Sequence, residues 1–135
     1  INSQNDGIKW ATKNDPRITP FGKFLRKARI DELPQLINVI KGDMTLIGPR
    51  PERPEIDAEL KKEINNYNLR YLLKPGLSGW AQVNSNYSAS LKESEIKLSY
   101  DVFYLKNFSL ILDLLIFFKT IKLVFNAKGS NPIES

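Results

Sequence analysis

The tetrapeptide Gly48-Pro49-Arg50-Pro51 separates two stretches of helical periodicity. Proline fixes φ, lacks a backbone N–H and pushes the residue before it toward extended conformations. Two prolines one residue apart therefore exclude regular structure and predict a rigid loop, with a brief strand over 43–47 ahead of it. This stiffness would lower the entropy cost of ordering the Arg50 side chain.

Two helices are expected before this loop. Thr19-Pro20 supplies an N-cap followed by proline at the first helical position, and it opens a short helix toward Lys27. The second helix is expected to begin at Asp31, because Pro34 then lies in the first turn, where its missing N–H costs nothing. Gly42 is expected to end this helix.

Three more helices are expected after the loop. The third runs from about Pro54 to Asn68, and the proline- and glycine-punctuated segment 74–80 is predicted to be another loop. Ser90 begins a capping box and opens the fourth helix. The residues expected to share one face of that helix are Ile96, Tyr100, Phe103 and Tyr104.

The fifth helix, 110–125, begins after the cap residue Ser109 and is nearly apolar all round. Its charged residues are Asp113, Lys119 and Lys122. Three charges in so short a segment argue against a transmembrane span. A buried core helix and a helix in the membrane interface both remain open.

The periodicities predict a mainly helical α+β fold with at most a short β-hairpin or strand pair, near the start or around 43–47. A chain of 135 residues with 41% hydrophobic and 26% charged residues fits one globular domain, 1–135. It starts with Ile1 and reads as a fragment of a longer protein.

The chain has no His and no Cys, which excludes a Ser-His-Asp triad, a Cys-His pair and the usual zinc site. Chemistry would then fall to carboxylates, amines and hydroxyls. A divalent metal would need oxygen ligands, which favours magnesium, manganese or calcium. The net charge of +5 suits phosphates, nucleic acid or an anionic membrane surface without choosing among them.

The adjacent carboxylates Asp31 and Glu32 lie at a predicted helix start, where free N–H groups and the helix dipole favour negative charge and can also receive a phosphate. A carboxylate nucleophile and a phosphoryl group could meet there. The alternative is that Asp31 is only a helix cap.

Arg26 and Arg50 give the acidic pair a cationic surround suited to phosphates. The basic residues that precede the pair are Arg17, Lys23, Arg26, Lys27 and Arg29. Each arginine also has a simpler interpretation, a solvated basic face for Arg26 and an incidental loop charge for Arg50. Trp80 could stack on a nucleotide base, but packing in the core is favoured.

Segments 29–44 and 46–51 together closely resemble the signature of the bacterial sugar transferase family, the monotopic phosphoglycosyl transferases. The resemblance continues through 74–83, Tyr100-Asp101 and Leu112-Asp113, and it covers the chain from Asn14 to about Val124. Segments 51–55 and 84–90 look most like members involved in exopolysaccharide synthesis.

This resemblance implies transfer of a sugar 1-phosphate from a UDP-sugar to a polyprenyl phosphate, usually undecaprenyl phosphate, with release of UMP. It implies that Asp31 forms a covalent phosphosugar intermediate, that Glu32 helps to hold Mg²⁺, and that Arg26 and Arg50 bind phosphate. The expected location is the cytoplasmic face of the bacterial inner membrane, with the membrane surface as a partner. Formation of a homo-oligomer is left open.

The chain departs from the family pattern in two places. Many shorter members have a Gly-Arg pair where this chain has Asn84-Ser85-Asn86, so the role of that arginine must be filled otherwise or not at all. The re-entrant membrane helix of the family is expected before residue 1.

Two other functions remain as alternatives to this enzymatic activity. The positive charge and the cluster before Asp31 would suit a small nucleic-acid-binding module, although the aromatic pattern does not support it and nucleic acid is not expected as a partner. The third hypothesis is an inactive domain that serves only as an assembly surface.

Overall fold

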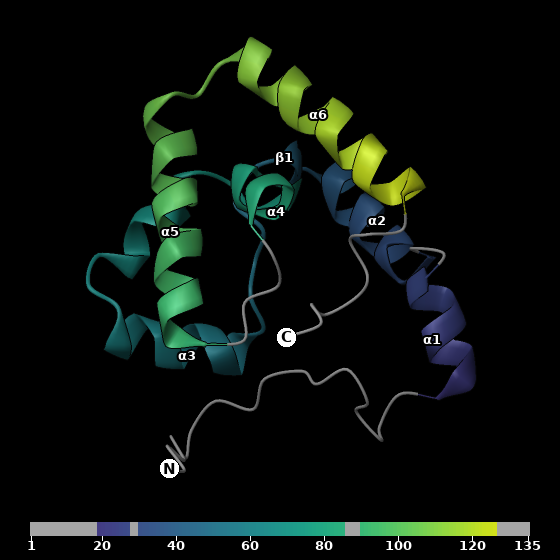
Figure 1. Cartoon of the computed structure of the whole chain (residues 1–135), viewed down its shortest axis with the longest axis horizontal. Helices are drawn as coiled ribbons and strands as arrows, with labels where there is room; N and C mark the ends of the chain where they lie inside the picture. The colour runs from purple at the N-terminus through teal and green to yellow at the C-terminus, as the bar shows by residue number, and fades with distance from the viewer. Residues whose placement is uncertain (1–18, 28–29, 86–89, 127–135) are drawn as a thin grey trace.

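The computed structural model describes residues 19–27, 30–85 and 90–126 (Figure 1). In chain order the elements are α1 (Pro20–Lys27), the 3₁₀ turn η1 (Ile30–Glu32), α2 (Leu33–Lys41), β1 (Thr45–Ile47), α3 (Pro54–Glu63), the 3₁₀ segment η2 (Tyr67–Leu72), β2 (Gly76–Ser78), α4 (Trp80–Asn84), α5 (Leu91–Lys106) and α6 (Leu110–Phe125). The mainly helical α+β fold with one strand pair is confirmed.

Side-chain caps begin the helices where the sequence predicts them. The Thr19 hydroxyl accepts a hydrogen bond from the Gly22 N–H at 3.0 Å, at the start of α1. Ser90 and Ser109 accept equivalent bonds at the starts of α5 and α6, at 3.2 and 3.1 Å. At the other end of α2, Gly42 has φ +84°, the left-handed conformation that ends a helix most easily in glycine.

Two segments after β1 differ from the sequence prediction. The third helix does not reach Asn68: it ends at Glu63, because Ile64 is extended and Asn66 adopts a left-handed turn with φ 61°. Asparagine tolerates this conformation and breaks helices locally. The segment 74–80 is not a simple loop, since it contains β2 and leads directly into α4.

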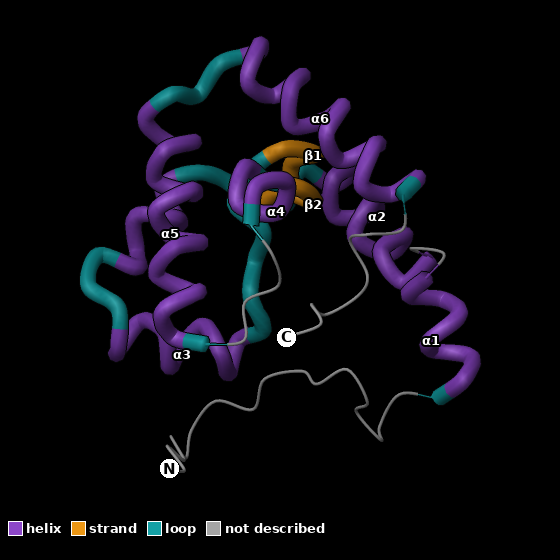
Figure 2. Tube along the Cα trace, viewed as in Figure 1, coloured by secondary structure: helices purple, strands orange, loops and turns teal. Residues whose placement is uncertain are grey.

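The two strands form a parallel pair at the centre of the molecule (Figure 2), with Thr45 opposite Gly76 and Ile47 opposite Ser78. The pairing extends past the strand ends, because the Gly48 N–H donates to the Ser78 carbonyl at 2.9 Å. The connection between the strands contains α3 and η2, so the pair is not a hairpin.

Glycines allow the backbones of these strands to approach closely. A Cβ atom added to Gly76 would lie 2.1 Å from the Gly48 nitrogen, and one added to Gly79 would lie 2.4 Å from the Gly48 carbonyl oxygen. Both contacts are to backbone atoms, which cannot move aside as a flexible side chain can. Glycine at these positions therefore fixes where the loop after β1 crosses β2.

The core joins α3, η2 and α5 through Leu60, Ile64, Tyr67 and Leu98. The buried residues of α5 are Ser94, Leu98, Asp101 and Tyr104. The four residues predicted to share one face lie on one side of this continuous helix, but that side is only partly buried, because Ile96 and Phe103 are 46% and 45% exposed. The buried face carries an aspartate and a serine, so hydrophobicity alone did not identify it.

Asp101 and Arg70 form a buried ion pair between α5 and η2, with an Nη2–Oδ2 distance of 3.3 Å and side chains only 1% and 4% exposed. No hydrogen-bond donor within the described residues meets either Asp101 oxygen in good geometry. Burial raises the pKa of Asp101 to about 6, although the charge of Arg70 opposes this shift.

Helix α6 turns polar groups inward and apolar groups outward. Within this fully described helix only Ile116 is buried, whereas Asp113 accepts a hydrogen bond from the Tyr104 hydroxyl at 2.6 Å and Thr120 bonds to Ser78 at 2.7 Å. Its most exposed apolar residues are Leu110, Ile111, Phe118 and Phe125. The core-helix interpretation is therefore wrong for α6. No described helix is both long enough and apolar enough to cross a bilayer.

We predict that Gly76→Ala lowers the free energy of unfolding by at least about 3 kcal/mol, because the new Cβ would overlap the backbone of Gly48. Gly42→Ala is the matched control. Gly42 has no atom within 4 Å of an added Cβ, so only its left-handed φ is penalised, at about 1 to 2 kcal/mol. Denaturant titration of both variants measures the difference, and equal losses would contradict the close approach.

We also predict that the titration of Asp101 makes the free energy of unfolding depend on pH. Since the pKa of Asp101 is about 6 in the folded state and 3.8 for an ordinary exposed aspartate, the native state keeps a proton between these two pH values that the unfolded state has lost. The stabilisation by that proton is complete below about pH 4 and is lost as the pH rises through 6, by on the order of 3 kcal/mol. Denaturation of the protein and of Asp101→Asn across this range should show the difference, and parallel curves would refute it.

Candidate active site

The acidic pair lies in the η1 turn, not in an α-helix that begins at Asp31. Helix α2 starts at Leu33, and its N-cap residue Glu32 makes no capping hydrogen bond with its side chain. Asp31 is exposed in the same turn. The position of the helix start is corrected by two residues, and the N-cap of α2 is not Asp31.

An ion pair joins this turn to the loop after β1. The Arg50 Nη2 donates to the Glu32 Oε1 at 3.0 Å, and its Nη1 donates to the carbonyl oxygen of Leu77 in β2 at 2.6 Å. The two side chains are 26% and 21% exposed, so the pair is partly shielded but open to a ligand. The structure thus brings together Glu32 and Arg50, two of the four predicted site residues.

The same loop is also held by residues of η2 and α5. Arg70 donates from Nη2 to the carbonyl oxygen of Arg50, and Lys97 of α5 pairs with Glu52. The loop therefore has contacts with η1 and β2 through the Arg50 side chain, and with η2 and α5 through its backbone and Glu52. These contacts and the two flanking prolines restrict the guanidinium to a narrow range of positions.

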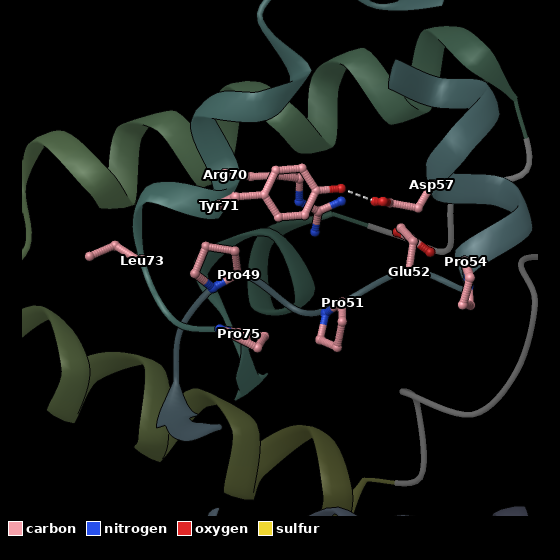
Figure 3. Close-up of a pocket in the computed structure, with 9 residues that line it drawn as sticks. All are labelled: Pro49, Pro51, Glu52, Pro54, Asp57, Arg70, Tyr71, Leu73 and Pro75. Atoms are coloured by element: carbon pink, nitrogen blue, oxygen red, sulfur yellow. Dashed lines mark hydrogen bonds between the residues drawn. The ribbon is translucent and has the colours of Figure 1, made fainter. Parts of the chain in front are cut away.

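A pocket of about 240 Å³ lies beside this loop (Figure 3). It is lined by Pro49, Pro51, Glu52, Pro54, Asp57, Arg70, Tyr71, Leu73 and Pro75. Its carboxylates have partners, since Asp57 accepts from the Tyr71 hydroxyl and pairs with Lys61 at 3.0 Å. The charges that line it are thus balanced within the protein.

Arg26 lies exposed on α1, the helix that contacts the η1 turn. It is therefore on an element next to the acidic pair, as the sequence suggests, but its phosphate-binding role stays a prediction. Of the basic cluster before Asp31, Arg17 and Arg29 lie outside the described residues.

Trp80 packs between helices. Its ring stacks on Phe103 at a centroid distance of 5.6 Å with an interplanar angle of 23°, and the Lys119 ammonium lies 4.9 Å from the ring centroid. These contacts join α4 to α5 and α6. They support the packing interpretation of Trp80 over base stacking.

The described residues contain no group of three or more acidic side chains placed to hold a metal ion. Mg²⁺ commonly uses only one or two carboxylates and takes its other ligands from water and substrate phosphates. Glu32, with Asp31 beside it, fits that mode of binding.

The residues that support the site are not predicted from the sequence. Asp101 belongs to a motif of the resemblance without an assigned role, and Arg70 belongs to no motif. A usable signal existed, because Arg70 lies among apolar neighbours in Leu69-Arg70-Tyr71-Leu72, and Asp101 is flanked by Tyr100 and Val102 within a helix. Charged residues in such surroundings are rarely buried without a partner.

A family model described as bacterial sugar transferase matches residues 1–127. Over 96% of its length the chain is 49% identical to the UDP-N-acetylgalactosamine-undecaprenyl-phosphate N-acetylgalactosaminephosphotransferase of Aeromonas hydrophila, and it covers 30% of that protein. Over 90% of its length it is 43% identical to the UDP-glucose:undecaprenyl-phosphate glucose-1-phosphate transferase of Xanthomonas campestris pv. campestris, and it covers 25% of it. The chain thus spans a quarter to a third of these relatives, and it belongs to the bacterial sugar transferase family.

Proposed function

We propose that this chain carries the catalytic residues for transfer of a sugar 1-phosphate from a UDP-sugar to undecaprenyl phosphate, with release of UMP. The observation that carries the proposal is the exposed Asp31 next to the Glu32–Arg50 ion pair, in a family whose named relatives act on these two classes of substrate. The reaction would be the first membrane step in the synthesis of exopolysaccharide or another glycoconjugate.

The reaction proceeds in two displacements. A carboxylate oxygen of Asp31 attacks the phosphorus that bears the sugar, and the bond from that phosphorus to the oxygen bridging the two phosphates breaks. UMP leaves with the electron pair of that bond. An oxygen of undecaprenyl phosphate then attacks the same phosphorus, forms the lipid diphosphate and returns Asp31 to its carboxylate form.

Arg50 and Glu32 have different electrostatic roles around Asp31. The guanidinium of Arg50 presents several N–H donors in a plane, which suits the oxygens of a diphosphate. Its contact with Leu77 keeps it in place while its contact with Glu32 gives way to substrate. Magnesium held by Glu32 and the diphosphate would lower the charge of the leaving UMP. Arg26 on α1 would supply a further positive charge.

The surroundings of Asp31 suit a lipid substrate. Ile30 and Leu33, on either side of the acidic pair, are 40% and 53% exposed, and Phe21 and Phe24 of α1 are more exposed still. Figure 1 shows α1 and α2 at the end of the molecule opposite α3 and α5, with α6 running toward them. This apolar end and the outward apolar side chains of α6 would rest on the cytoplasmic face of the inner membrane, where both the UDP-sugar and the lipid phosphate are accessible.

We predict that Asp31→Asn lowers the rate of UMP release by more than about a thousandfold, because the amide is a poor nucleophile. Asp43→Asn is the matched control, since Asp43 is also exposed and lies at the far end of α2. Both are made in the full-length protein and assayed with Mg²⁺, undecaprenyl phosphate and a panel of UDP-sugars. Normal turnover by Asp31→Asn would show that another group is the nucleophile.

We predict that Phe118→Glu lowers binding of the protein to vesicles of phosphatidylethanolamine and phosphatidylglycerol by about tenfold or more, because it removes an aromatic anchor and adds negative charge. Leu72→Glu is the control, since Leu72 is similarly exposed, at 68% against 63%, but belongs to η2. Sedimentation with vesicles measures both. Equal losses would argue against α6 as the membrane-facing helix.

A further inference from the structure

We propose that Arg70, held by Asp101, is a positioning residue that sets the Arg50 guanidinium toward the acidic pair. This inference rests on the proposed function, in which Arg50 binds the diphosphate. Neither Arg70 nor Asp101 touches Asp31 or Glu32 through a described hydrogen bond or ion pair, so their influence on the reaction would pass through the loop after β1.

Arg70 uses its two terminal nitrogens on different elements. Nη1 donates to the Tyr67 hydroxyl at 2.6 Å, whereas Nη2 donates to the Arg50 carbonyl oxygen and lies 3.3 Å from Asp101 Oδ2. A guanidinium is planar and rigid, so these contacts together fix both its position and its tilt. The Arg50 carbonyl is therefore held at a set place relative to η2 and α5.

The two ends of Arg50 are thus held by different parts of the fold. Its carbonyl is bound by Arg70, and its guanidinium is bound by the Leu77 carbonyl at 2.6 Å. Pro49 and Pro51 limit the backbone between these contacts. If the contact with Arg70 is lost, the Arg50 carbonyl is restrained only by the two prolines and by the Gly76 N–H bond to the Pro49 carbonyl, and the guanidinium samples positions away from Glu32 more often.

Stability alone gives little reason for this ion pair. Two charges with side chains only 4% and 1% exposed are costly to desolvate, and a buried pair can often be replaced by apolar residues without loss of stability. The raised pKa of Asp101 is consistent with that cost. What apolar residues could not replace is the hydrogen bond to the Arg50 carbonyl, which is the feature that connects the pair to the site.

The test uses Arg70→Lys in the full-length protein. Lysine keeps the charge opposite Asp101, but its single ammonium cannot reproduce the fork that reaches both Tyr67 and the Arg50 carbonyl. We expect kcat/KM for the UDP-sugar to fall by about tenfold or more, divided between kcat and KM in the same way as in Arg50→Lys. Combining both substitutions should cost little more than Arg50→Lys alone, because the two residues act as one unit.

Two controls separate positioning from lost stability. Arg53→Lys makes the same chemical change at an exposed residue next to the loop, and it should leave kcat/KM within about twofold of the unmodified protein. Tyr67→Phe removes one contact of Arg70 and leaves its contact with the Arg50 carbonyl, so it should lose less kcat/KM than Arg70→Lys. The proposal is overturned if Arg70→Lys behaves like Arg53→Lys.

A paired apolar replacement covers the case in which Arg70→Lys does not fold. Arg70→Met combined with Asp101→Leu removes both buried charges together and should retain the fold. It should still lose activity as Arg50→Lys does. A folded double variant with normal kcat/KM would overturn the proposal.

Hydrogen exchange gives a reading that does not depend on the reaction. Amides in peptides covering 46–53 should exchange faster in Arg70→Lys than in Arg53→Lys, while peptides of α6 stay unchanged. Unchanged loop exchange would refute the positioning role even in an active enzyme. Conversely, faster loop exchange in a protein that releases no UMP from any UDP-sugar would support the positioning role while the proposed function fails.

Discussion

The contact on which the site depends is the one between Arg50 and Glu32, 3.0 Å long, which joins the turn before α2 to the loop after β1. This contact forms only if that loop crosses β2 at a fixed place. Gly48, Gly76 and Gly79 allow the close crossing, and the prolines on either side of Arg50 prevent the loop from relaxing into other conformations. The strand pair is short, yet it sets the position of the cation that faces the acidic turn.

The balance of charge explains why the site can act on an anionic donor. Asp31 and Glu32 are adjacent carboxylates, and their negative charge would repel an anionic diphosphate unless cations lay close by. Arg50 reduces that repulsion directly through its contact with Glu32. Arg26 adds a positive charge on α1, the helix that contacts the η1 turn. Glu32 forms the ion pair with Arg50, whereas Asp31 stays exposed and can react. The two adjacent carboxylates therefore have separate roles.

The features of the fold that depend on a few neighbouring residues could be predicted from the sequence. Caps at Thr19, Ser90 and Ser109 and the terminating Gly42 placed helix ends correctly, because each depends on a few neighbouring atoms. The strand β2 was missed because its partner lies across α3 and η2, and a parallel pairing leaves no turn motif in the sequence. The buried face of α5 was missed in part because it includes Asp101, whose burial depends on a distant arginine. The acidic pair and Arg50 were found through motif and resemblance, whereas their support required tertiary contacts.

The central claim is that a carboxylate oxygen of Asp31 becomes bonded to phosphorus during turnover. The most direct measurement is mass spectrometry of tryptic peptides after the full-length protein reacts with a UDP-sugar and Mg²⁺ in the absence of lipid acceptor. Trypsin cuts after Arg29 and Lys41, so the peptide 30–41 should carry the added sugar phosphate at Asp31, and undecaprenyl phosphate should then remove it. UMP release without any adduct on this peptide, or an adduct mapped to another residue, would contradict the account.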